Sequence, residues 1–155
     1  MLARAAGMDL TPIHYKGGAP AVQALLGGQT PISINPEGEM LPYVQSGKLR
    51  VLAVTGSRRS RFLPDVPTMA ESGYKDLVVD SWLGFFVPAR TPSEIVARLS
   101  NAIAEALKSR DVAETITKSG NEVAYAGPAE LTGIIRADTE RWGPVVKASG
   151  FTAED

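Results

Sequence analysis

The chain has 155 residues, of which 44% are hydrophobic and 21% charged, and its formal net charge is −1. This near-neutral balance argues against a nucleic-acid partner, and the absence of cysteine excludes disulfides, thiol catalysis and thiolate-bound metals. A single histidine argues against a histidine relay or metal site, no apolar stretch approaches the ~18 residues of a membrane span, and the first residues lack the apolar core of a signal peptide.

Short apolar segments and helices alternate along the first half of the chain. Residues 2–6 are predicted to be the end of a helix that stops at Gly7. Further helices are predicted over 18–26 and 37–47, with Pro42 in the first two turns of the second. Alternating or β-branched apolar residues predict strands over 10–15, 30–34 and 49–55, and a short helix over 69–73 follows a basic loop.

The segment that begins at residue 77 is strongly apolar. Residues 77–89 form a run too long for one ordinary strand, and Gly84 interrupts it, so we expect a strand that bends or crosses between two lobes. Thr91-Pro92-Ser93-Glu94 predicts a helix start in which Thr91 caps the helix and Glu94 completes a capping box. A buried helix face is predicted by apolar residues repeating every four positions: Ile95, Leu99, Ile103 and Leu107.

Two more helices and a strand complete the alternation. We predict a helix over 111–119, a strand over 122–126 and a last helix from Gly127-Pro128 to Gly150. Pro144 predicts a kink in that helix. Its apolar stripe consists of Leu131, Ile134, Ile135, Trp142, Val145 and Val146. The regular alternation of strands and helices favours an α/β fold class.

The start of the helix over 18–26 is a candidate anion site. Tyr15-Lys16-Gly17-Gly18-Ala19 brings glycines to the helix N-terminus, where unsatisfied N–H groups and the positive end of the helix dipole favour an anion. The GxxxxGK[ST] spacing of a nucleotide-binding loop is missing. A tight turn with a solvated lysine fits the same residues, so the pattern leaves both interpretations open and favours the turn.

Other polar residues are weaker candidates. His14 has no carboxylate or serine relay near it in the sequence, which favours a structural histidine over a catalytic one. Asn35 follows a predicted strand, where open α/β sheets place ligands, but an Asx turn explains it as well. Asp138 lies on the apolar stripe and is interpreted as a partly buried acid paired with an arginine. A solvated basic cluster is the interpretation of Arg58, Arg59 and Arg61. We therefore predict no catalytic residues, no metal and no cofactor.

Four segments follow one another in order across essentially the whole chain: HYKGGAPAVQALLGGQ, LPYVQSGKLRVLAVTGSRRSRFLPDVPTMAESGY, SWLGFFVPARTP and IIRADTERW. Together they resemble the TctC/Bug family, the extracytoplasmic solute receptors of tripartite tricarboxylate transporters. The resemblance implies a two-lobed fold of the type II periplasmic binding proteins, with an α/β sandwich in each lobe. It also implies that a small organic acid is held in the cleft and handed to membrane subunits of the transporter, without any chemistry.

The resemblance implies a set of ligand-binding residues: Tyr15, Lys16, Gly17, Gly18, Ala19, Asn35, Ser81 and Trp82. The first five match a cleft loop whose backbone amides meet ligand oxygens, and the last two match the segment where the chain returns to the first lobe. Pro36-Glu37-Gly38-Glu39 departs from the small and apolar residues common in the family. Two added acids near the cleft disfavour a highly charged polyanion by repulsion.

The resemblance covers only the C-terminal half of family members. It implies that residues 1–80 form a partial second lobe, with the cleft loops, and that residues 81–155 return to the first lobe. Unpaired sheet edges then predict a homodimer, for example by exchange of elements. The alternative function is a dimerising structural or interaction module that does not bind solute. Full-length family members are periplasmic, and this chain is expected to lack a signal peptide.

Overall fold

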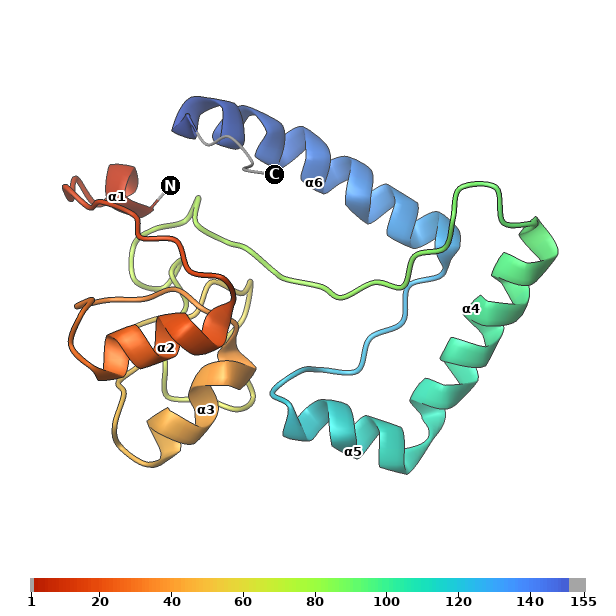
Figure 1. Cartoon of the computed structure of the whole chain (residues 1–155), viewed down its shortest axis with the longest axis horizontal. Coiled ribbons are helices and arrows are strands. Elements are labelled where there is room, and N and C mark those ends of the chain that lie inside the picture. Colours follow the sequence, from red (N-terminus) through yellow and green to blue (C-terminus); the bar gives the residue numbers. More distant parts are fainter. Residues whose placement is uncertain (1, 151–155) are drawn as a thin grey trace. The chain divides into compact units, whose positions relative to one another are not determined.

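The computed structural model describes residues 2–150, and it contains six helices there (Figure 1). Their bounds are α1 Leu2–Ala5, α2 Gly18–Leu26, α3 Glu37–Gln45, α4 Ser93–Lys108, α5 Arg110–Lys118 and α6 Pro128–Ser149. The described residues divide into two compact units, one of residues 2–82 and 114–122 and the other of 83–113 and 123–150. The predicted assignment of 1–80 and 81–155 to two lobes remains a prediction.

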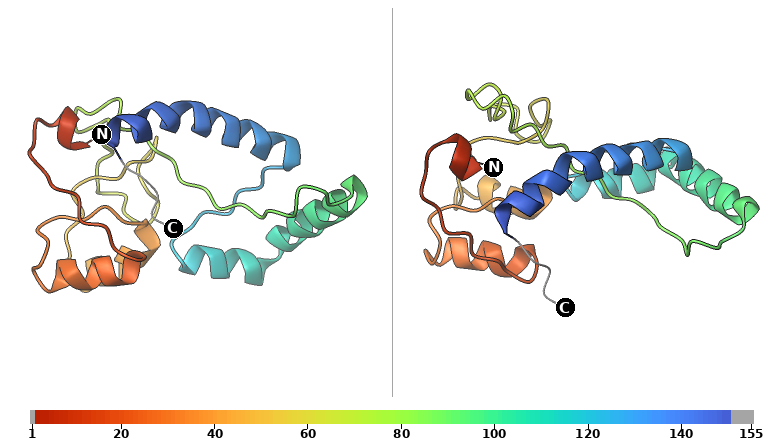
Figure 2. Two further views of the ribbon diagram at one scale, coloured as in Figure 1. Left: turned by 45° about the horizontal axis from the view of Figure 1, so that its top comes forward. Right: turned by 90° about the horizontal axis from the view of Figure 1, so that it is seen from above.

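Helices α2 and α3 pack against each other within the first unit (Figure 2). They bury Val22 and Ala24 from α2 and Leu41 from α3. Helix α2 has the predicted bounds, and α3 ends two residues earlier than predicted with Pro42 in its second turn. Gly28 follows α2 with a φ of +71°, a conformation that glycine adopts without strain. These two helices therefore form the packed part of the first unit.

The predicted strands do not form a sheet within the described residues, where the only β pairing is an isolated parallel bridge between Val54 and Thr68. Around this bridge, the Val54 N–H donates to Pro67 O at 3.0 Å and the Met69 N–H donates to Val54 O at 2.8 Å. On the other side, the Val79 N–H donates to Thr55 O at 2.7 Å. A strand requires a neighbour that exchanges backbone hydrogen bonds with it over several residues. The described chain supplies such neighbours only at these few positions.

Residues 69–73, predicted as a short helix, form turns instead. The Thr68 and Glu71 side chains each bond the other's backbone N–H, at 3.0 Å and 2.8 Å. This reciprocal arrangement is that of a capping box, but Gly73 follows two residues later with a φ of +96°. The chain turns at that glycine before a helix can extend.

Helices α4 and α6 belong to the second unit, and neither buries a residue. The predicted buried face of α4 is therefore wrong, since Ile95 and Leu99 are 37% and 45% exposed. Helix α4 also begins one residue later than predicted. The Ile95 and Val96 N–H groups bond the carbonyl of Pro92, so Pro92 and not Thr91 occupies the capping position. Helix α6 starts at Pro128 and ends in a left-handed Gly150, as predicted.

Candidate functional site

The loop before α2 has the geometry that the sequence predicted for a helix start built on glycine. Gly17 occupies the N-cap position with φ 99° and ψ 173°, a region that side chains rarely tolerate. Its N–H donates to Tyr15 O at 2.9 Å. No side chain of the described residues caps α2 at Gly17, and α3, α4 and α6 lack such a cap as well. Because Pro20 has no N–H, the first turn of α2 offers the N–H groups of Gly18 and Ala19.

The predicted residues of this loop differ in exposure. Tyr15 and Gly18 are half-buried, whereas Lys16 and Ala19 are exposed. An exposed lysine is a strongly hydrated point charge, so Lys16 contributes little fixed geometry. A hydrogen bond within this loop joins backbone groups, since the Gly17 N–H bonds Tyr15 O while Gly17 itself is exposed.

A hollow of about 350 Å³ lies between α2 and α3, next to this loop. Its lining residues are Ala19, Val22, Gln23, Glu39 and Tyr43. Helical periodicity explains the set, because Ala19 and Gln23 are four residues apart on α2 and Glu39 and Tyr43 are four apart on α3. Sequence analysis predicted only Ala19 of these five. The i, i+4 spacing along both helices was the signal that could have identified Gln23 and Tyr43.

The Glu39 carboxylate lies against Gly18, the first residue of α2. A Cβ added to Gly18 would fall on that carboxylate, so the approach requires a residue without a side chain. Glu39 stands in the first turn of α3 together with Glu37. Glu37 is engaged elsewhere, since its Oε1 accepts a hydrogen bond from Ser60 Oγ. Glu39 therefore brings negative charge to the start of α2.

The remaining predicted site residues do not line this hollow. Asn35 is half-buried, and its Nδ2 donates to Ser33 Oγ, so its amide takes part in a local turn contact. Ser81 and Trp82 are exposed. The roles of Asn35, Ser81 and Trp82 in ligand binding, like those of the loop residues, remain predictions.

The arginine cluster forms specific contacts in the structure. Arg58 pairs with Glu122 at 2.5 Å, and Arg59 pairs with Glu71 at 2.9 Å. Arg61 lies over the Phe62 ring, 5.1 Å from its centroid. All three arginines are exposed, which agrees with the interpretation of this cluster as a solvated face, and the structure adds their surface partners. Asp138 is half-buried on α6, as expected for its place on the apolar stripe.

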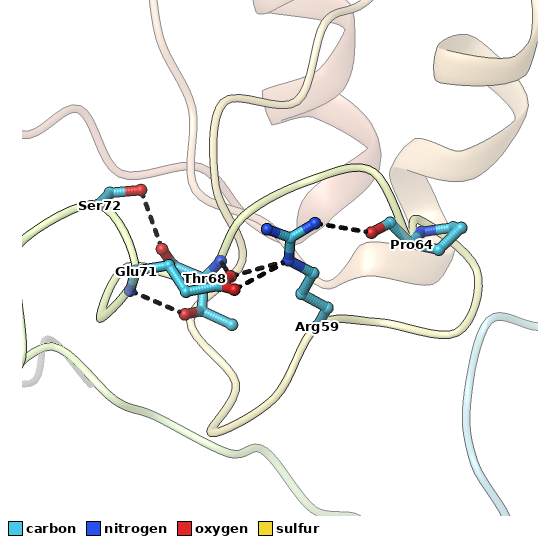
Figure 3. A network of polar contacts seen from close by, with 5 residues as sticks. All are labelled: Arg59, Pro64, Thr68, Glu71 and Ser72. Atoms are coloured by element: carbon cyan, nitrogen blue, oxygen red, sulfur yellow. Dashed lines mark hydrogen bonds and ion pairs between the residues drawn. The ribbon is translucent and has the colours of Figure 1, made fainter.

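Figure 3 shows the polar network around Glu71, which fixes the loop after residue 56. Arg59 Nε donates to both Glu71 oxygens, at 2.9 and 3.0 Å, and the Thr68 N–H also donates to Glu71. The hydrogen bond from Arg59, followed by that from Thr68, lowers the pKa of Glu71 below its ordinary value of 4.5. Since every member bonds to another residue of the same loop, this network is structural.

Residues 2–150 contain neither a membrane-spanning helix nor a cluster of metal ligands. No helix there is both long and apolar enough to cross a bilayer. No group of three or more acidic or histidine side chains gathers there as metal ligands would.

The fold matches that of periplasmic solute-binding proteins. MatC from Rhodopseudomonas palustris with bound malate superposes with a TM-score of 0.82 at 32% identity, covering 94% of this chain and 50% of that one. The periplasmic binding protein BugD superposes with a TM-score of 0.80 at 34% identity, covering 96% of this chain and 50% of that one. The predicted fold class, one half of a periplasmic binding protein, is confirmed.

Sequence comparison identifies the family within this class. Residues 1–151 match the tripartite tricarboxylate transporter family receptor, TctC, and the chain belongs to this family. BugT of Bordetella pertussis is 38% identical over 144 residues, which are 93% of this chain and 44% of BugT. A UPF0065 protein of Pseudomonas knackmussii is 32% identical over 94% of this chain and 87% of its own length.

Family membership confirms the predicted resemblance, and it confirms that the chain belongs with receptors and not with enzymes. The chain spans about half the length of several relatives, including BugT, MatC and BugD.

Proposed function

We propose that this chain forms part of a receptor for a small organic carboxylate, and that backbone amides at the start of α2 hold the carboxylate. The observation that carries the proposal is the backbone of Gly17, whose positive φ leads into α2 without a side-chain cap. Family membership supports it, and so does MatC, a relative whose bound malate is a carboxylate.

The physical basis is the set of N–H groups that the first turn of a helix leaves without intrahelical partners. A carboxylate satisfies these groups and is also attracted by the positive end of the helix dipole. Gly17 and Gly18 lack side chains, so ligand oxygens can approach the backbone closely. Tyr15, Asn35, Ser81 and Trp82 remain the predicted side-chain contacts, with Lys16 as a solvated charge nearby.

The proposed setting is that of the family. The receptor works in the periplasm and delivers its ligand to membrane subunits of a tripartite transporter. Binding and release are its whole activity, so no step requires a catalytic side chain.

The proposal is tested by thermal unfolding of the chain against a panel of mono-, di- and tricarboxylates. A ligand that binds only the folded state at 100 times its Kd stabilises by about 2.7 kcal/mol, which raises the Tm in a concentration-dependent manner. At least one carboxylate is expected to do so. A Tm that no carboxylate moves would contradict the proposal.

Two glycines at opposite ends of α2 provide a matched control. Gly17 and Gly28 both have positive φ, and at both positions an added Cβ meets nothing within 4 Å. Gly17→Ala and Gly28→Ala both place a Cβ at positive φ, and Gly17→Ala is the more strained of the two, because φ 99° with ψ 173° is a region open almost only to glycine. The comparison therefore depends on the carboxylate response and not on the Tm of the free protein. Gly17→Ala is expected to abolish the carboxylate response, whereas Gly28→Ala is expected to keep it at a lowered Tm.

A second candidate function, the dimerising module, is supported by one exposed apolar run. Leu83, Phe85 and Phe86 are 89%, 79% and 69% exposed. Exposed apolar runs of this kind favour association, and a second copy of the chain is the occupant that we infer. Light scattering after size exclusion is expected to give a dimer that Phe85→Ser with Phe86→Ser dissociates, while Leu52→Ser, at another exposed apolar residue, leaves it intact. A monomer at all concentrations would contradict this candidate.

A further inference from the structure

Among residues 2–150, the hollow between α2 and α3 is lined by one acidic side chain and by no basic one. Of its five lining residues, Glu39 carries a negative charge at neutral pH and none carries a positive charge. The others are two apolar side chains, Ala19 and Val22, and two neutral hydrogen-bonding ones, Gln23 and Tyr43. A ligand whose carboxylate meets the start of α2 would extend the rest of its structure over or into this hollow.

Glu39 is positioned to interact with whatever the ligand carries next to its carboxylate. Its carboxylate already lies against Gly18, the first residue of α2 and part of the proposed binding backbone. Glu39 is exposed, so solvent screens its charge. Two negative charges about 4 Å apart repel by about 1 kcal/mol in bulk water. A ligand with a second carboxylate at this point would meet that repulsion, whereas one with an ammonium group would meet an attraction.

We propose, on the basis of the carboxylate-binding function above, that Glu39 is a specificity-determining residue that selects monocarboxylates bearing a cationic amino group and disfavours di- and tricarboxylates. Glu37 does not share this role. Its carboxylate accepts a hydrogen bond from Ser60, and Glu37 does not line the hollow. The selection therefore depends on one acid of α3 and not on the net charge of the helix.

The proposal is tested with three four-carbon probes that differ in one terminal group: butanoate, 4-aminobutanoate and succinate. The full chain is titrated with each by calorimetry. The unsubstituted chain is expected to bind 4-aminobutanoate most tightly and succinate most weakly. Glu39→Gln keeps the side-chain shape and removes the charge. It is expected to shift the affinity ratio of succinate to 4-aminobutanoate by up to about tenfold toward succinate. Butanoate is expected to bind somewhat more tightly as well, because Glu39 lies against Gly18 and also repels the carboxylate held at the start of α2.

Glu37→Gln is the matched control, because it removes the same charge two residues away on the same helix. It is expected to leave the ratio unchanged. An equal shift in Glu37→Gln, or no shift in Glu39→Gln, would overturn the role of Glu39 while the carboxylate-binding function stands. If none of the three probes, and no carboxylate of the wider panel, binds the unsubstituted chain, both proposals are overturned together.

Discussion

The α2–α3 pair and the helices α4 and α6 all carry apolar residues, but they differ in burial. The pair buries Val22, Ala24 and Leu41, which are 2%, 3% and 8% exposed. In α4 and α6 no residue is buried, although both carry apolar stripes. Helices thus form in both regions, but among residues 2–150 only those of the first region pack against a neighbour that removes apolar side chains from water. Most helical stability in proteins comes from that packing.

The largest expected change in stability tests this difference in burial by comparing two leucines, one from each region. Leu41→Ala removes a buried side chain and is expected to lower the free energy of unfolding by about 2–5 kcal/mol. Leu99→Ala removes a side chain that is 45% exposed, so a loss below about 1 kcal/mol is expected. Urea denaturation followed by circular dichroism measures both. Equal losses would mean that the stripe of α4 is buried in solution.

A smaller effect is expected at the polar network of the first unit. Thr68 is 3% exposed, and its Oγ1 accepts the Glu71 N–H at 3.0 Å. Thr68→Val keeps the volume and removes the acceptor, so a loss of about 1 kcal/mol is expected in the same denaturation experiment. Thr55→Val is the control. The Thr55 hydroxyl is exposed and donates to Val79 O, so after the substitution water can reach that carbonyl in its place. If Thr55→Val lowers the free energy of unfolding more than Thr68→Val does, burial of the hydroxyl is not what determines the loss.

The pH dependence of stability tests the same network through Glu71. The hydrogen bond from Arg59 lowers the Glu71 pKa in the folded protein, so the unfolded chain binds this proton at a higher pH. The stabilising contribution is therefore fully present above pH about 4.5 and is lost as the pH falls through the lowered value. Glu71→Gln is expected to flatten the Tm profile on the acid side, and Arg59→Gln is expected to flatten it partly. If the Tm profile of Glu71→Gln is identical to that of the unsubstituted chain, Glu71 does not contribute to the pH dependence of stability.

The sequence predicted helices best where they are bounded by strong local signals. Gly18 and Gly27 bound α2, and Pro128 and Gly150 bound α6, at the predicted positions. Strands were predicted from apolar alternation, but a strand also requires a partner, and only the residues around Val54 find one among the described residues. Local patterns predict which segments are extended. Local patterns do not predict which other segment each extended segment pairs with.

The candidate site also has features that the local sequence could predict and others that depend on tertiary packing. The loop at Gly17 could be predicted, because glycines before a helix are a local signal. The position of Glu39 against Gly18 could not, because it depends on how α3 packs on α2. The sequence did indicate that the acids at 37 and 39 disfavour a polyanion, but it gave no reason to distinguish one from the other. The structure distinguishes them, because Glu37 bonds Ser60 and Glu39 lines the hollow. The family, and with it the fold class, was accessible through several motifs together, none of which is specific alone.

The smallest expected effect concerns a pair on α4. Lys108 Nζ lies 2.7 Å from Glu105 Oε1, closer than the 2.9 Å between Arg59 and Glu71. The Lys108 and Glu105 side chains are nevertheless 70% and 72% exposed, and no third group within residues 2–150 holds them in the way Thr68 holds Glu71. Solvent and salt screen such a pair, so Glu105→Ala is expected to change the free energy of unfolding by less than about 0.5 kcal/mol. A loss as large as that of Thr68→Val would mean that α4 depends on its surface pair. Burial would then not be what distinguishes the two regions, because a contact on the exposed helix would stabilise as much as one in the packed unit.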